Sequence, residues 1–126
     1  MIEHTFRTIT LRYGEHTKQK RILKFADERY GILTEFFASE ADSFRRQILD
    51  AVEPVQRNEE TDAAFAGNKY GFSVFNDEAV IFDQLEDPIR FCQLPFEDFW
   101  DLLAEWYGLD QEEEKENEEV CEADGD

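Results

Sequence analysis

Residues 94–109 read LPFEDFWDLLAEWYGL, a stretch that predicts an amphipathic helix. Pro95 suits the first turn of a helix, and Gly108 suits its C-terminal cap. The large apolar residues recur at three- and four-residue spacing, which places them on one broad face. They are Phe96, Phe99, Trp100, Leu103, Trp106 and Tyr107. We therefore expect this helix to bury its aromatic side chains in the core.

The opposite side of this predicted helix is acidic. Glu97, Asp101 and Glu105 stand four residues apart, with Asp98 beside them. Because the helix dipole stabilises carboxylates in the first turn, Glu97 and Asp98 need no further explanation. Glu105 falls in the last turn, where negative charge is disfavoured, and it follows Asp101 at the repulsive i+4 position. This unfavourable placement points to a function for the acidic side.

The preceding segment, residues 57–88, predicts a β-meander. Apolar residues alternate with small or polar ones in YGFSVF and again in AVIFDQL, as in strands with one buried face. Gly67-Asn68 and Asn76-Asp77 supply the turns between them. A last strand over residues 89–94 leads directly into the C-terminal helix.

The N-terminal half predicts a hairpin followed by a helix. Residues 4–13 alternate with period two, GEHT forms a turn, and residues 18–26 return as the second strand. Residues 29–38 suit a strand or a short helix equally well. In the next segment, Ser39 precedes Asp42 by three residues, a capping signature, and apolar residues follow at four-residue spacing. We expect this helix to end before Pro54.

Together these elements predict an α+β fold. Its antiparallel sheet has about five strands, and two main amphipathic helices pack on one face of that sheet. Residues 1–109 form one domain. Residues 110–126 hold ten carboxylates and one lysine, which predicts a disordered, solvating tail that can steer a basic partner from a distance.

The charge of −18 is unevenly distributed along the chain. Residues 1–57 have a net charge of +1, residues 58–109 of −10 and residues 110–126 of −9. This excess predicts repulsion from anionic membranes and nucleic acids, so we expect neither as a direct ligand. No apolar run approaches the roughly 18 residues that span a bilayer, which predicts a soluble, cytoplasmic protein.

No motif for catalysis or cofactor binding stands out, and we expect a protein without enzymatic activity, cofactor or metal. The two cysteines, Cys92 and Cys121, lack metal-ligand or redox spacing and are interpreted as reduced thiols. The cations Lys18, Lys20, Arg21 and Lys24 suit phosphate binding, pairing with the acidic half of the chain, or solvation of an edge strand.

The acidic residues of the second half are the candidate partner-binding site. We expect them to form one electronegative patch on the folded domain. They are Asp77, Glu78, Asp83, Glu86, Asp87, Glu97, Asp98, Asp101 and Glu105.

The segment GNKYGFSVFNDEAVIFDQLEDPIRFCQLPFEDFWDLLAEWY, residues 67–107, resembles the C-terminal half of small bacterial immunity proteins. These proteins neutralise toxins of contact-dependent growth inhibition and related polymorphic toxin systems. The resemblance implies an inhibitor that acts by binding and has no catalytic residues. Two alternatives remain: an acidic mimic of nucleic acid that occupies a DNA- or RNA-binding protein, and an acidic adaptor domain without inhibitory role.

Overall fold

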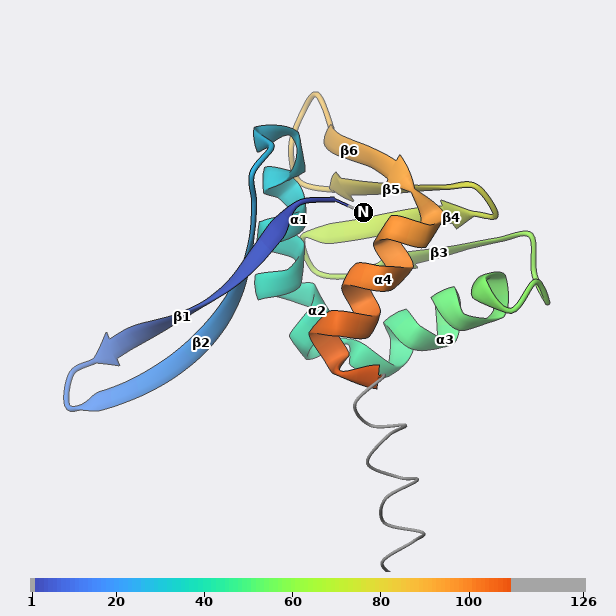
Figure 1. Cartoon of the computed structure of the whole chain (residues 1–126). Helices are drawn as coiled ribbons and strands as arrows, with labels where there is room; N and C mark the ends of the chain where they lie inside the picture. Colours follow the sequence, from blue (N-terminus) through green and yellow to red (C-terminus); the bar gives the residue numbers. More distant parts are fainter. Residues whose placement is uncertain (1, 110–126) are drawn as a thin grey trace, which may run out of the picture.

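The computed structural model describes residues 2–109, which form two antiparallel sheets and a set of helices (Figure 1). A hairpin comes first, a helical segment follows, and a four-stranded meander leads into the last helix. The elements are β1 His4–Tyr13, β2 His16–Phe25, the 3₁₀ turn η1 Glu28–Tyr30, α1 Gly31–Ala38, α2 Glu40–Ser43, α3 Arg45–Gln56, β3 Asp62–Ala66, β4 Tyr70–Phe75, β5 Glu78–Asp83, β6 Arg90–Pro95 and α4 Phe96–Tyr107. The α+β class is therefore confirmed, whereas the expectation for residues 110–126 lies outside the described residues.

The meander and the last helix follow the predicted pattern. The sheet order is β3-β4-β5-β6, and all neighbouring strands are antiparallel. Gly108 ends α4 with φ of 67°, the left-handed conformation that favours glycine at a helix C-terminus. Pro95 immediately precedes the first helical residue, one position earlier than expected.

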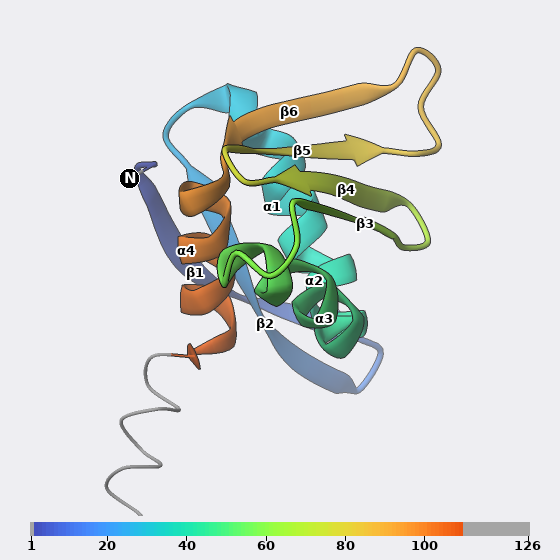
Figure 2. The same cartoon turned by 90° about the vertical axis from the view of Figure 1, so that its right-hand side faces the viewer.

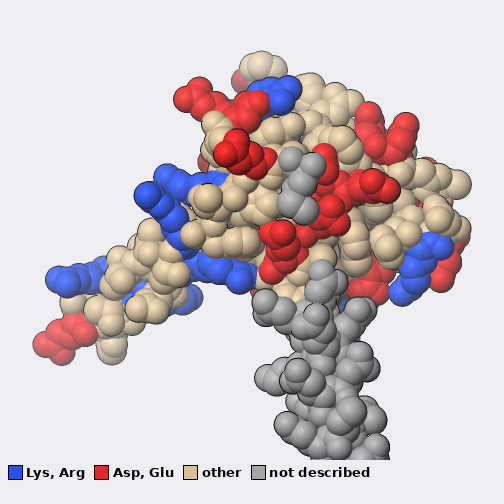
Figure 3. Space-filling model, in the orientation of Figure 1, with Lys and Arg blue, Asp and Glu red and all other residues tan. Residues whose placement is uncertain are grey.

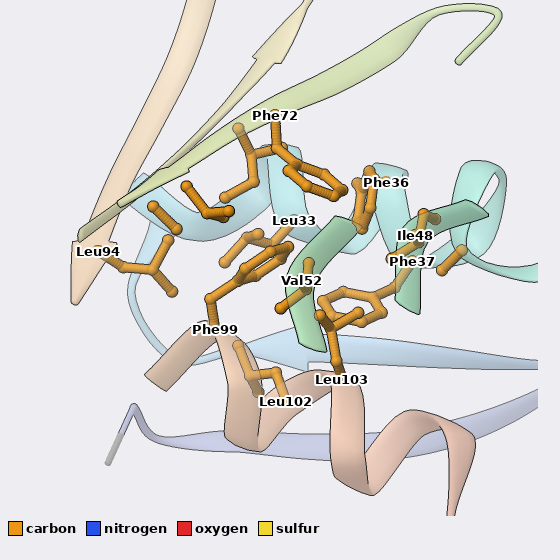
Figure 4. Packing of buried hydrophobic residues seen from close by; sticks show 14 of the residues in the cluster. Leu33, Phe36, Phe37, Ile48, Val52, Phe72, Leu94, Phe99, Leu102 and Leu103 are labelled. Carbon is orange, nitrogen blue, oxygen red and sulfur yellow. The ribbon is translucent and has the colours of Figure 1, made fainter. Parts of the chain in front are cut away.

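One hydrophobic core joins the four-stranded sheet to α1, α3 and α4 (Figure 4). At its centre the rings of Phe36, Phe72 and Phe99 form a triangle, with centroids 5.3–6.1 Å apart in edge-to-face or tilted arrangements. These rings come from α1, β4 and α4 and are fully buried. Aromatic pairs at this spacing add to the free energy of area burial, so the triangle fixes α4 against the sheet.

The sheet has an outer face opposite this core. Along β5, Ala79, Ile81 and Asp83 are buried while the intervening residues are partly exposed, the alternation expected of a strand covered on one side. Phe91 of β6 is 59% exposed on the outer side. The helices therefore cover one face only (Figure 2).

The hairpin forms a separate two-stranded sheet, which corrects the expectation of a single sheet of about five strands. Leu23 of β2 is fully buried and anchors the base of the hairpin to the core. Beyond this base, the hairpin projects away from the domain as an arm formed by β1 and β2 (Figure 1). Because the arm packs on helices at its base, it does not extend the four-stranded sheet.

The helical segment differs from the prediction in two ways. Ser39 does not cap a helix with its side chain; its hydroxyl donates instead to the Glu35 carbonyl at the end of α1. The predicted helix is divided into α2 and α3, and α3 continues through Pro54 to Gln56. Pro54 lies in the last turn of α3, between the buried residues Val52 and Val55. The packing of these two side chains keeps the turn helical although Pro54 has no N–H to donate.

Residues 31–38, for which the sequence favoured neither strand nor helix, form α1. Its buried residues are Ile32, Leu33, Phe36 and Phe37, two adjacent pairs four positions apart. This spacing places all four side chains on one helical face.

A buried carboxylate holds the turn between β3 and β4. Glu40 is 3% exposed and accepts backbone N–H groups from Asn68, Lys69 and Tyr70 at 2.9–3.4 Å. Gly67 allows this approach, because a Cβ there would stand 1.9 Å from a Glu40 carboxylate oxygen. Glu40 thus links α2 to the sheet through hydrogen bonds that the sequence pattern did not indicate.

Among residues 2–109, no helix combines the length and apolar character needed to cross a bilayer.

Candidate protein-binding surface

The acidic side of α4 and the β4–β5 turn form one continuous part of the surface. The Phe96 N–H donates to the Asp77 carbonyl at 3.2 Å, and Glu78 lies opposite Pro95 in the strand register. These contacts bring Asp77 and Glu78 to the start of α4, beside Glu97 and Asp98. Figure 3 shows acidic side chains gathered in this region, whereas several Lys and Arg side chains lie along the arm.

A hollow of about 430 Å³ lies beside these carboxylates, and we call it the acidic groove. The end of α3, the β4–β5 turn and the first half of α4 supply its walls. Its lining residues are Val55, Gln56, Asn58, Asn76, Phe96, Glu97, Trp100 and Asp101. Trp100 is half-buried, so part of its ring faces the groove while the rest packs against the core. The groove therefore combines an aromatic surface with two carboxylates.

Asp101 is the carboxylate most affected by its neighbours. Partial burial raises its pKa, and the charges of Asp98, Glu97 and Glu105 raise it further. The folded protein therefore disfavours the ionised form of Asp101 at neutral pH. The ionised carboxylate of Asp101 is therefore maintained at a cost to the stability of the fold.

The substitution Asp101→Asn should consequently stabilise the protein. At pH 7 we expect the free energy of unfolding to rise by about 0.5 kcal/mol, since the repulsion within the helix is removed. The gain should vanish as the pH falls below the ordinary pKa of 3.8, because Asp101 is then protonated in both states. Urea denaturation at several pH values measures this difference, with Asp50→Asn on α3 as the isosteric control. A loss of stability at pH 7 would contradict the electrostatic interpretation.

Glu105 has a structural partner that the sequence did not indicate. Its carboxylate lies 2.6 Å from Nε2 of His4, whose side chain is 8% exposed, and His4 Nδ1 lies 2.6 Å from the Ile2 carbonyl. Burial alone lowers the pKa of His4, but these two acceptors together raise it above 6.5. The pair joins β1 to α4, so the position of Glu105 in the last helical turn has an explanation in the fold.

The substitution Glu105→Gln should lower the pKa of His4, because a neutral amide replaces the carboxylate. In the wild type the folded state binds the His4 proton more tightly than the unfolded state does. The contribution of the His4–Glu105 pair to the free energy of unfolding is therefore complete below about pH 6.5, and it is lost as the pH rises through the pKa of His4 in the folded state. NMR titration of the His4 ring measures the change, and the His16 resonance provides an internal reference. An unchanged His4 titration would contradict the contact.

Four predicted residues lie away from the acidic groove, and Glu105, which pairs with His4, is one of them. Asp83 is fully buried at the far end of β5, so it does not belong to an exposed acidic patch. Its carboxylate accepts the Leu85 N–H at 3.0 Å and lies within 3.6 Å of Arg90 and Lys69. Burial tends to raise the pKa of Asp83, but the Leu85 N–H and the two cations lower it overall.

Glu86 and Asp87 occupy the exposed β5–β6 loop, at the opposite end of β5 from the β4–β5 turn. The structure thus divides the nine predicted residues rather than gathering them in one patch. Trp100 is the main groove residue that the sequence pattern assigned to the core instead.

The cations of the arm make few contacts. Arg21 lies 4.4 Å over the Trp106 ring, and its guanidinium donates to the Trp106 carbonyl. Within residues 2–109, no carboxylate forms an ion pair with Lys18, Lys20 or Lys24. Pairing with the acidic half of the chain, one of the three roles that the sequence suits, is therefore not found in this part of the protein.

In the same described range, no group of three or more His, Cys, Asp or Glu residues is arranged to hold a metal ion. Cys92 is buried, and burial raises the pKa of its thiol to about 12, which makes it a poor nucleophile. Cys121 lies outside the described residues.

No protein-family model, curated protein or solved structure matches this chain.

Proposed function

We propose that this chain is a non-catalytic inhibitor that binds a basic protein, and that it acts as an immunity-type protein against a nuclease toxin. One observation carries the proposal: the acidic groove places Glu97 and Asp101 beside a partly exposed Trp100. The resemblance of residues 67–107 to immunity proteins agrees with this proposal.

The groove suits an arginine or lysine side chain of the partner. A guanidinium stacks on the exposed part of Trp100 and donates to the carboxylates of Glu97 and Asp101. Interfaces of this kind depend on a few anchors, in which tryptophan and arginine are enriched. An incoming cation also relieves the repulsion that raises the pKa of Asp101. Asp101, whose ionised form is disfavoured in the free protein, therefore contributes to the complex.

The remaining charge serves the approach of the partner. Nuclease toxins carry basic surfaces that hold phosphate backbones, and an acidic inhibitor covers such a surface. The net charge of −10 over residues 58–109 attracts a basic protein and accelerates its association.

A comparison of matched charge reversals tests the proposal. The full chain is immobilised and exposed to a lysate of the organism that encodes it, and bound proteins are quantified by mass spectrometry. The test variant carries Glu97→Lys and Asp101→Lys in the groove. The control carries Glu86→Lys and Asp87→Lys in the β5–β6 loop, which change the net charge equally at a distant site.

We expect a basic protein to be retained by the wild type and the loop variant and lost by the groove variant. Its nuclease activity, measured on purified RNA and DNA, should be blocked by the wild type and by the loop variant but not by the groove variant. Equal loss of the partner from both variants would show that binding depends on net charge and not on the groove. If the retained partner has no activity against nucleic acid, the chain is still a protein-binding protein, but the proposal that it inhibits a nuclease is contradicted.

A further inference from the structure

The arm formed by β1 and β2 has a charge of the opposite sign to that of the whole chain. Residues 4–25 hold six Lys or Arg residues and a single carboxylate, Glu15, so their net charge is +5 in a chain of −18. The arm projects away from the domain, and several Lys and Arg side chains lie along it (Figures 1 and 3). The positive charge is therefore concentrated on the projecting part of the structure.

One face of the arm carries most of these cations, and we call it the cationic face. Residues directly opposite each other in an antiparallel pair share a face, and here each cation stands opposite an apolar residue or a threonine. The four cations are Arg7, Lys18, Lys20 and Lys24. No Asp or Glu belongs to this face, and none of the four forms an ion pair within residues 2–109.

The cationic face is the side of the ribbon that does not pack on the domain. The other side holds Leu23, which is fully buried in the core, and Phe6, whose ring stacks with that of Trp106 at 6.3 Å. On the cationic face, Lys18 and its neighbours Arg7 and Lys24 are exposed, and Lys20 is partly exposed. The charged groups of this face are therefore accessible to a ligand.

Two flat rings stand at the tip of the same face. Tyr13 lies opposite His16 in the register, and both residues are exposed, Tyr13 to 59%. Sites for single-stranded nucleic acid combine cations that follow the phosphate backbone with aromatic rings on which the bases stack. A carboxylate side chain or a lipid headgroup has no ring to stack on these two residues. Because stacking needs an unpaired base, the tip suits a single strand better than a duplex.

The negative charge of the domain does not prevent such a contact. Each strand of the arm has ten residues, so the arm is about 33 Å long at a rise of about 3.3 Å per residue. The Debye length at physiological ionic strength is about 8 Å, so the tip lies about four Debye lengths from the base. The repulsion expected from the net charge of −18 is therefore screened along the outer part of the arm, where Lys18 and Lys20 stand.

We propose that the cationic face of the arm binds single-stranded nucleic acid. The phosphates lie against Arg7, Lys18, Lys20 and Lys24, and bases stack on the rings at the tip. Phosphate contacts and stacking carry little sequence information, so the binding is largely independent of base sequence. It does not depend on the proposed function of the acidic groove, which lies on other elements.

Fluorescence anisotropy with the full chain and a labelled oligothymidylate strand tests the proposal. We expect binding at about 0.15 M salt, where the charge of the domain is screened. The logarithm of the association constant should fall with the logarithm of the salt concentration with a slope of about −3, as four phosphate contacts on a single strand predict. The variant with Lys18→Gln, Lys20→Gln and Lys24→Gln should bind more than about tenfold more weakly, with a slope of about −1. Tyr13→Ala should weaken binding about tenfold and leave the slope unchanged.

A charge-matched control carries Arg29→Gln, Arg46→Gln and Arg57→Gln, which remove three exposed cations outside the arm. It should bind like the wild type, and an equal loss in this control would overturn the proposal, because net charge would then decide the affinity. Undetectable binding to the strand, or equal binding to a duplex, would also overturn it. Tighter binding to vesicles of anionic phospholipid, or displacement of the strand by polyglutamate at the same concentration of charge, would assign the face to another class of polyanion.

Nuclear magnetic resonance locates the contact and shows that the variants remain folded. Addition of the strand should shift the amide resonances of residues 5–24 in the wild type and leave those of α4 unchanged. Shifts confined to α4 or to the four-stranded sheet would contradict binding by the arm. In the variants, unchanged amide resonances of the free arm would show that the loss of affinity comes from the missing side chains.

Discussion

The substitution Glu40→Ala is expected to lower the free energy of unfolding by about 2–4 kcal/mol, since three backbone N–H donors, one of them buried, lose a charged acceptor at once. The Tyr70 N–H is buried and those of Asn68 and Lys69 are partly buried, and alanine offers none of them an acceptor. Equilibrium denaturation in urea measures the loss. A reduction in the midpoint without a change of slope would indicate that the native state remains compact.

Glu40→Gln is the matched control for this prediction. Glutamine has nearly the same shape and retains one acceptor oxygen, so it should cost about 1–2 kcal/mol, less than alanine. Gly67→Ala should also be destabilising, because its Cβ would collide with the Glu40 carboxylate in the present geometry. If Glu40→Ala changed the stability by less than the glutamine variant, the carboxylate would not be what holds the β3–β4 turn.

Replacement of Trp100 by alanine should weaken the complex with the captured partner about 30- to 100-fold, the effect of removing a central aromatic anchor. We expect most of this loss in the dissociation rate, because the indole contacts the partner only after docking. Surface plasmon resonance resolves both rate constants. The β5–β6 loop offers a control, since Leu85→Ala removes a side chain that is 72% exposed and lies outside the groove.

Charge substitutions in the groove should change the association rate more than the dissociation rate. Glu97→Gln should reduce the association rate and its salt dependence, because this exposed carboxylate contributes to steering. Trp100 also packs partly against the core, so circular dichroism must show that the alanine variant remains folded. A folded Trp100→Ala variant with unchanged affinity would contradict the role of the groove.

The elements predicted from sequence were those defined by short-range patterns. In α4 the apolar spacing, the proline before the helix and Gly108 after it all agree, and the alternation in β4 groups Tyr70, Phe72 and Val74 on the face that is buried. In β5 the alternation separates two faces without indicating which one is buried. Residues 29–38 were ambiguous because their aromatic residues suit both strand and helix. Helical spacing of Ile32, Leu33, Phe36 and Phe37 becomes decisive only when the core shows which residues are buried.

The candidate site was predicted in part, and the errors come from contacts between distant residues. Glu105 pairs with His4, 101 positions away, and no local pattern contains that pair. Asp83 resembles the other carboxylates in the sequence, but it lies on the buried face of β5, where it contacts the partly exposed cations Arg90 and Lys69. The period of a strand predicts which face a residue occupies, but not which cations the fold brings to that face. The separation of the arm from the main sheet has the same origin.

Hydrogen exchange of the chain, free and bound to its captured partner, tests the central claim most directly. The account predicts slower exchange at residues 55–58, 76–78 and 96–101, which surround the acidic groove. Exchange in the β5–β6 loop, residues 84–89, should be unchanged. Protection confined to that loop and to the outer sheet face around Phe91, with the groove unaffected, would contradict the account.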